Sequence, residues 1–213
     1  MMKKILILGD SIRMGYDKYV KMAFEDVAQV HYPVSNCRFS SHLLRHLQEW
    51  VEETGCADEL DLVYWNAGLW DTLLLADGLP HIPLDVYKAN VDRICRQLQM
   101  FAPKAKIIFA TSTPVQEELF TGRFKRKNKD VEQYNLAAAR IVESYGGQVD
   151  DLYTMAKNAP VSYHSDQTHY YTKEGKKLFT EHVAATMEKA LGIKGKPLDF
   201  DALFTVTKNI EGL

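Results

Sequence analysis

The feature that most constrains the fold is a set of short, uninterrupted apolar runs, each ended by turn residues. The clearest runs are residues 5–8, 62–65 and 107–109. Continuous rather than alternating apolar residues are typical of strands that are covered on both faces in a parallel sheet. The runs therefore predict an α/β fold rather than a β-sandwich, with strands at residues 4–8, 29–32, 60–65, 106–110 and 147–149.

Segments with helical periodicity lie between these runs. In residues 84–101, between Pro83 and Pro103, an apolar residue recurs at every third or fourth position, which predicts an amphipathic helix. Similar patterns predict helices at residues 16–24, 41–54, 128–145 and 172–191. Alternation of strands and helices, with right-handed crossovers, predicts a doubly wound parallel sheet of about five strands.

The length of 213 residues is typical of one domain, which we place at residues 1–192. Residues 193–213 form a tail, and the apolar side chains of Phe200, Leu203, Phe204 and Val206 should pack it on the domain or on a second subunit of a homo-oligomer.

Charge and cysteine content narrow the possible partners and the location. The formal charge of −2 leaves no positive excess to neutralise a nucleic acid, so none is expected as a partner. No apolar run approaches the roughly 20 residues needed to cross a bilayer, and the first run is too short for a signal peptide. Three cysteines, Cys37, Cys56 and Cys95, lack any zinc-binding spacing, and free thiols are typical of the cytoplasm.

The turn after the first predicted strand is Gly9-Asp10-Ser11. It delivers Ser11 to the end of a strand and the start of a helix, where backbone N–H groups favour a developing oxyanion. Ser11 is therefore a candidate nucleophile. An ordinary helix N-cap is the alternative for the same position.

A second candidate motif, Asp166-Gln167-Thr168-His169, precedes the last predicted helix. A carboxylate three residues before a histidine can orient its ring and leave the other nitrogen free to take a proton. A helix-capping aspartate beside a surface histidine is the alternative. The predicted sheet brings this loop and Ser11 to the same edge, so the three side chains can converge.

Together with the Asn66-Ala67-Gly68 turn, these motifs resemble the GDSL/SGNH hydrolase family over nearly the whole chain. The resemblance implies a three-layer, flavodoxin-like α/β/α fold and an esterase or acylhydrolase activity. It implies that Ser11 is the nucleophile and that Asp166 and His169 complete a catalytic triad.

The resemblance also implies an oxyanion hole with departures from the usual pattern. Ser11 and Arg38 would supply backbone N–H groups, with Arg38 in a position that is usually glycine. Trp70 occupies the usual position of the asparagine donor, and Asn66 is the nearest amide to replace it. The alternative for Asn66 is a side chain that satisfies its own turn.

Residues near these motifs are candidates for substrate binding, and they include Asp10, Arg13, Trp70 and Tyr170. Paired guanidinium groups of Arg13 and Arg38 would favour an anionic ester, although solvated surface residues are the alternative. The aromatic side chains are candidates for a sugar-stacking wall or for the core. A polar segment at residues 117–129 is either a basic flap over the site or a solvated loop.

These residues predict a serine esterase that cleaves a small acyl ester, such as an O-acetyl group on a carbohydrate, without a metal or organic cofactor. An acyltransferase would use the same residues. A non-catalytic ligand-binding module on the same fold is the alternative from another class.

Overall fold

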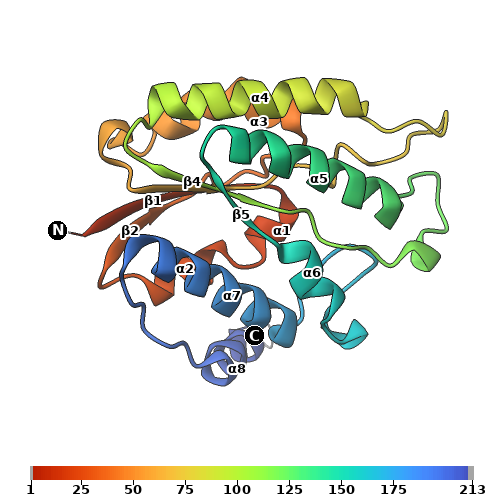
Figure 1. Cartoon of the computed structure of the whole chain (residues 1–213). Coiled ribbons are helices and arrows are strands. Elements are labelled where there is room, and N and C mark those ends of the chain that lie inside the picture. Colours follow the sequence, from red (N-terminus) through yellow and green to blue (C-terminus); the bar gives the residue numbers. More distant parts are fainter. Residues whose placement is uncertain (1, 211–213) are drawn as a thin grey trace.

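The computed structural model describes the backbone of residues 2–210 and the side chains of residues 2–205. Its sheet contains five parallel strands in the order β2-β1-β3-β4-β5. The strands are β1 (Lys3–Leu8), β2 (Ala28–His31), β3 (Leu62–Trp65), β4 (Lys106–Ala110) and β5 (Gln148–Asp150). The sheet lies between two layers of helices (Figure 1), which confirms the predicted three-layer α/β/α architecture.

The apolar runs are continuous because both faces of the sheet are buried. In β1, Ile5 and Ile7 point into one core, whereas Leu6 and Leu8 point into the other. All four side chains are at most 1% exposed. Successive residues of a strand point to opposite faces, so a strand covered on both sides needs apolar side chains throughout.

One face of the sheet is covered by α3 (Ser40–Glu52), α4 (Leu84–Phe101) and α5 (Asn128–Ser144). On the other face lie α1 (Ser11–Met14), α2 (Asp17–Ala23), α6 (Leu152–Lys157) and α7 (Lys173–Leu191).

The predicted strands and helices match the observed bounds within two residues at each end. Three helices were not predicted. Two of them, α1 and α6, are too short to show helical periodicity, and the third is α8 (Phe200–Ile210) in the tail. Three short 3₁₀ turns, Ala57–Glu59, Glu117–Leu119 and Val161–Tyr163, complete the described elements.

The described part of the tail lies against the domain. The rings of Phe200 and Phe204 pack on Tyr19 of α2, with centroids 5.2 and 6.2 Å away. The Lys196 N–H donates to the carbonyl oxygen of Ala23 at 2.8 Å. The side chain of Val206 and residues 211–213 lie outside the described residues, and packing on a second subunit stays a prediction.

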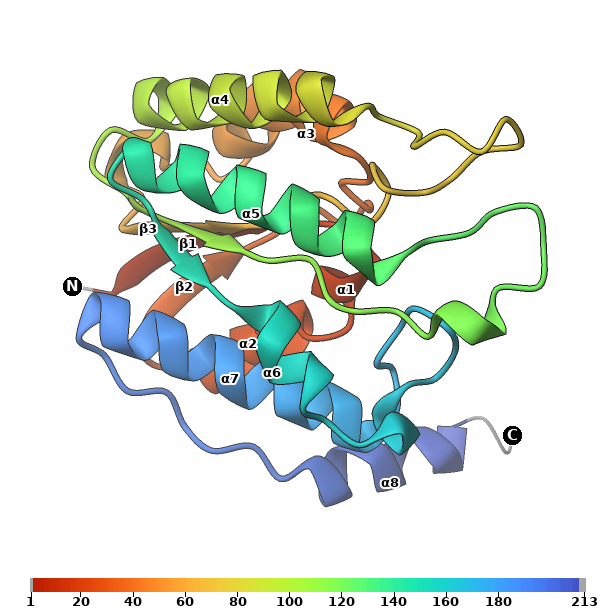
Figure 2. The same cartoon turned by 45° about the vertical axis from the view of Figure 1, so that its right-hand side comes forward.

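The strand order places the loops that matter for function. Because the chain runs outward in opposite directions from β1 and β3, a crevice forms beyond the carboxyl ends of these two neighbouring strands. The loops after β3 and β4 and the loop before α7 extend from this same end of the molecule (Figure 2). Within residues 2–210, no helix has both the length and the apolar character required to cross a membrane.

Candidate active site

Ser11 lies at the carboxyl end of β1 and is the first residue of α1. The N-cap of this helix is Asp10, whose side chain accepts a hydrogen bond from the Ile12 N–H at 2.9 Å. Asp10 rather than Ser11 therefore caps the helix, which removes the alternative for Ser11. The hydroxyl of Ser11 lies 2.7 Å from Nε2 of His169.

His169 is oriented by the carboxylate three residues before it. Its Nδ1 lies 2.8 Å from Oδ2 of Asp166. The other carboxylate oxygen accepts the backbone N–H groups of Thr168 at 2.7 Å and His169 at 2.8 Å. The loop therefore holds the carboxylate by its own backbone, and the carboxylate holds the ring.

The charge of Asp166 suits this role. Burial raises its pKa, but the N–H groups of His169 and Thr168 and the His169 ring outweigh that effect, so the pKa lies below its ordinary value. The carboxylate is therefore ionised at neutral pH, where it can stabilise a protonated imidazole. Ser11, His169 and Asp166 thus form a continuous chain of hydrogen bonds with the geometry of a nucleophile, a base and an orienting acid.

Tyr171 fixes the histidine loop to α1. Its hydroxyl donates to the carbonyl oxygen of Ser11, and its ring lies against His169 with centroids 4.8 Å apart. The predicted contact was the preceding residue, Tyr170. That residue is 3% exposed, packs on Phe179 and donates to the carbonyl of Pro114, so its burial contradicts the predicted substrate contact.

Arg13 does not face the site. It is 1% exposed, forms an ion pair with Asp17, and donates to the carbonyl oxygens of Pro33 at 2.9 Å and Ser35 at 2.6 Å. Its guanidinium group therefore ties α1 and α2 to the segment after β2. The prediction that Arg13 binds an anionic substrate is wrong, because its donors are already used inside the protein.

The predicted role of the Arg38 backbone also needs correction. Arg38 has a φ of 56°, a left-handed conformation that favours glycine. Its N–H donates to Oδ1 of Asn36 at 2.7 Å, so this N–H is not free for an oxyanion. The side chain is exposed, which matches the solvated alternative.

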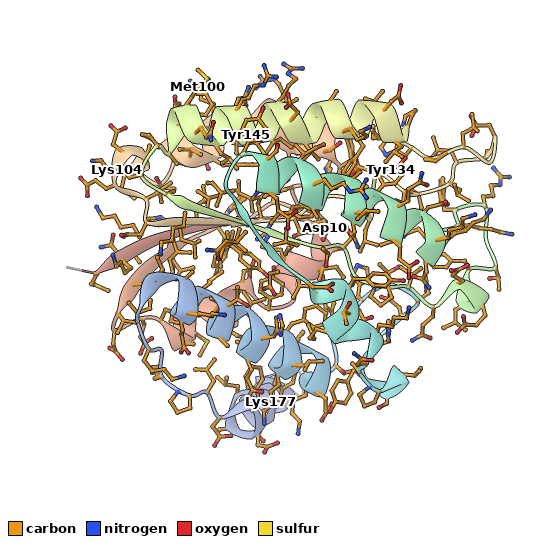
Figure 3. The ribbon with its side chains drawn as sticks, viewed as in Figure 1. Asp10, Met100, Lys104, Tyr134, Tyr145 and Lys177 are labelled. Atoms are coloured by element: carbon orange, nitrogen blue, oxygen red, sulfur yellow. The ribbon has the colours of Figure 1, made fainter. Side chains whose placement is uncertain are left out.

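Asp10 directly precedes Ser11 and is buried. Asp10 is 1% exposed, and Figure 3 shows it between the two helical layers. Burial raises the pKa of Asp10, although the Ile12 N–H opposes the shift. Its helix-capping position contradicts the prediction that it contacts the substrate directly.

Asn66 follows β3 and is 4% exposed. Within the described part of the chain, its amide oxygen and the Oδ2 of Asp10 are buried without a hydrogen-bond partner. The alternative for Asn66 was a side chain that hydrogen-bonds within its own turn. The amide oxygen forms no such bond.

A cavity of about 480 Å³ adjoins the site. It is lined by Trp70, which is partly exposed as a substrate-binding role requires, by Gln167 of the histidine loop, and by Arg126. Sequence reasoning placed Arg126 only in a generally basic loop and missed its position. Among the described residues, no group of three or more His, Cys, Asp or Glu side chains is arranged to hold a metal ion.

No family model matches the chain, and no curated protein matches it in sequence. Solved structures match its fold closely. A lipase/acylhydrolase from Enterococcus faecalis is 18% identical, with a TM-score of 0.72 over 93% of this chain and 100% of that one. A GDSL-like lipase from Bacteroides thetaiotaomicron is 20% identical, with a TM-score of 0.67 over 89% of each chain.

An acetylxylan esterase from Geobacillus stearothermophilus is also similar in fold. It is 17% identical, with a TM-score of 0.65 over 92% of this chain and 97% of that one. The resemblance to GDSL/SGNH hydrolases that the motifs predict is thus confirmed at the level of the fold.

Proposed function

We propose that this chain is a serine hydrolase of the GDSL/SGNH type that cleaves a small acyl ester. The observation that supports the proposal most strongly is the hydrogen-bond chain from Ser11 through His169 to Asp166, with 2.7 Å and 2.8 Å links. A binding module would not need a hydroxyl, an imidazole and an ionised carboxylate aligned in this order.

In the proposed mechanism, Oγ of Ser11 attacks the ester carbonyl carbon while Nε2 of His169 takes the hydroxyl proton. Asp166 stabilises the resulting imidazolium. The tetrahedral intermediate collapses as His169 gives its proton to the leaving alcohol, which produces an acyl-enzyme. Water then attacks the acyl group with His169 as the base, releasing the acid and restoring the Ser11 hydroxyl.

The oxyanion of both intermediates would lie at the ends of β1 and β3. We assign its donors to the Ser11 N–H and the Asn66 amide, because both groups are located at this crevice. The Arg38 N–H is left out of this set, since it donates to Asn36.

The proposed substrate is a small ester such as an O-acetyl group on a carbohydrate. The site is open, with the His169 side chain 27% and the Asp166 side chain 42% exposed, so the alcohol portion can extend into solvent. Acetylxylan esterases with the same fold support this substrate class. Transfer of the acyl group to a second alcohol would use the same residues, and product analysis with added sugar acceptors distinguishes it from hydrolysis.

Hydrolysis of p-nitrophenyl esters from acetate to octanoate tests the proposal. Ser11→Ala should lower kcat by about 10⁴-fold or more, because the members of a triad act as a unit. The matched control is Ser144→Ala, since Ser144 lies on the exposed surface of α5 and its hydroxyl bonds only the local Ile141 carbonyl among the described residues.

A fluorophosphonate probe gives a second readout, and mass spectrometry should locate the adduct on Ser11. Equal turnover by the wild type and Ser11→Ala, with no adduct on Ser11, would overturn the serine mechanism.

A further inference from the structure

The lining of the cavity beside the site combines apolar side chains with polar ones and with two arginines, the exposed Arg123 and the half-buried Arg126. Its lining includes Trp70, Leu73, Leu119 and Phe124, together with Arg126. Leu119 and Phe124 are 50% and 57% exposed, so the cavity that Arg126 lines also presents apolar surface to solvent. Such a lining suits a ring or short chain that also bears a charged group.

The guanidinium group of Arg126 is only partly used by the protein. Its Nε donates to the carbonyl oxygen of Leu69 at 2.5 Å, which holds the side chain against the loop after β3. Within residues 2–205, neither of its two terminal nitrogens makes a hydrogen bond. Burial lowers the pKa of Arg126, although Asp10 and Asp166 oppose this effect. A partly buried guanidinium with free donors favours an anionic acceptor.

The two carboxylates that affect Arg126 electrostatically, Asp10 and Asp166, do not accept hydrogen bonds from its terminal nitrogens. Asp166 is bound by His169 and Thr168, and Asp10 accepts from Ile12. Oδ2 of Asp10 has no partner among the described residues, but neither carboxylate accepts a hydrogen bond from Arg126, so both attract the guanidinium group only electrostatically. Arg126 is therefore within electrostatic range of Asp10, which directly precedes Ser11, and of Asp166, which orients His169.

We propose that Arg126 and the surrounding cavity form a subsite that binds a carboxylate on the substrate, so that the enzyme prefers anionic esters. The inference rests on the proposed esterase function and adds a substrate class to it. The terminal nitrogens of Arg126 bind the carboxylate, and Trp70 and Phe124 contact the attached ring or chain. The carboxylate belongs either to the alcohol part or to the acyl part of the ester, and the chemistry at Arg126 is the same.

Two matched pairs of esters test the subsite. For the alcohol part, 4-acetoxybenzoate is compared with the neutral 4-acetoxybenzamide. For the acyl part, mono-p-nitrophenyl succinate is compared with p-nitrophenyl butyrate. Within each pair, the ratio of kcat/KM for the anionic ester to that for the neutral ester is measured in the wild type, Arg126→Gln, Arg126→Lys and Lys127→Gln.

We expect Arg126→Gln to lower this ratio roughly 10- to 100-fold for one pair, which identifies the part that bears the carboxylate. Arg126→Lys should retain part of the ratio, because it keeps the charge and loses the two-nitrogen geometry. Lys127→Gln makes the same charge change at the next residue, which is exposed and outside the cavity lining, and should leave the ratio at the wild-type value.

A binding measurement separates failure of the subsite from failure of the esterase function. In the Ser11→Ala background, millimolar 4-hydroxybenzoate or succinate should raise Tm, and Arg126→Gln should abolish the rise. Ser11-dependent hydrolysis with unchanged ratios in Arg126→Gln would overturn the subsite alone. If no ester is hydrolysed in a Ser11-dependent way, the proposed function is overturned. If, in addition, Arg126→Gln does not change the rise in Tm, the subsite is overturned as well.

Discussion

At the scale of single residues, the site depends on two glycines at positions where a Cβ would collide with a neighbouring side chain. Gly9 is the first, because a Cβ there would lie 1.9 Å from Oδ1 of Asn66. Gly68 is the second, since its φ is +152° and a Cβ would lie 2.4 Å from Oγ of Ser112. Both glycines let the ends of β1 and β3 approach the buried side chains at the crevice.

Gly9→Ala should destabilise the protein by about 1 to 3 kcal/mol, because the new methyl group must displace Asn66 in a packed interior. Thermal unfolding measures the effect. The control is Gly122→Ala, where no atom of the described residues, apart from Gly122 and its two chain neighbours, lies within 4 Å of the added Cβ, and its Tm should match the wild type. Equal Tm values for both variants would contradict the close approach.

The left-handed backbone conformation of Arg38 is less favourable for arginine than for glycine. Arg38→Gly and Arg38→Ala both remove the exposed side chain, but only glycine adopts the φ of 56° freely. We expect the glycine variant to be more stable than the alanine variant by about 1 kcal/mol in urea unfolding. The reverse order would mean that this backbone position is not left-handed in solution.

Asn66 can be tested as an oxyanion donor by Asn66→Ala. Loss of one donor to the developing charge should lower kcat by about 10²- to 10³-fold while KM changes little. Asn36→Ala provides a comparison, because it frees the Arg38 N–H and should not lower kcat to the same extent. A raised KM with unchanged kcat in Asn66→Ala would instead assign the amide to substrate binding.

At the scale of elements, α3 is capped by a residue from a different segment. Its N-cap residue, Phe39, offers no capping side chain. Instead, the carboxylate of Asp71 in the loop after β3 accepts the Ser40 N–H at 3.1 Å and the Ser40 hydroxyl, and Asn90 of α4 donates to the same hydroxyl at 2.9 Å. This network fixes the start of α3 to the crevice loops.

Burial raises the pKa of Asp71 to about 7, against an ordinary value of 3.8. The folded protein therefore holds this proton more tightly than the unfolded chain, and the contribution of Asp71 to stability falls as pH rises from about 4 to 7. Asp71→Asn lacks this titration. The stability of Asp71→Asn relative to the wild type should rise across that interval and level off above it.

Urea unfolding of both proteins at pH 4 to 8 measures this difference. Parallel stability curves for the two proteins would mean that the carboxyl group titrates normally in the folded state.

The elements themselves were largely predictable, because strands buried on both faces and amphipathic helices leave clear patterns. The meeting of Ser11 and His169 was predictable from the strand order. The direction of single side chains was not. Of the neighbouring residues Tyr170 and Tyr171, the first is buried in the core and the second lies against His169, and the pattern does not tell which one faces the site.

For Arg13 a signal was present, since Asp17 lies four residues later on the sequence and forms its ion pair. The position of Arg126 could not be predicted, because it depends on how the loop before α5 folds back to the Leu69 carbonyl.

At the scale of the whole molecule, the proposed catalytic groups are assembled from distant parts of the chain. Ser11 and His169 are separated by 158 residues and are joined through the sheet and helices that lie between them. Long-range contacts of this kind form late, because the chain must first lose the entropy of closing a large loop. Recovery of activity should therefore report on completion of the sheet.

After dilution from urea, labelling of Ser11 by a fluorophosphonate should return with the same rate constant as the burial of tryptophan measured by fluorescence. Labelling that returns before the fluorescence change would contradict this coupling.

The same separation means that Ser11 and His169 are synthesised at different times on the ribosome. Ser11 leaves the exit tunnel early but has no base until the segment around His169 follows it. A nascent chain that stops at residue 165 should be inert toward esters and toward the probe, so the proposed hydrolase becomes active only after the segment around His169 has been synthesised.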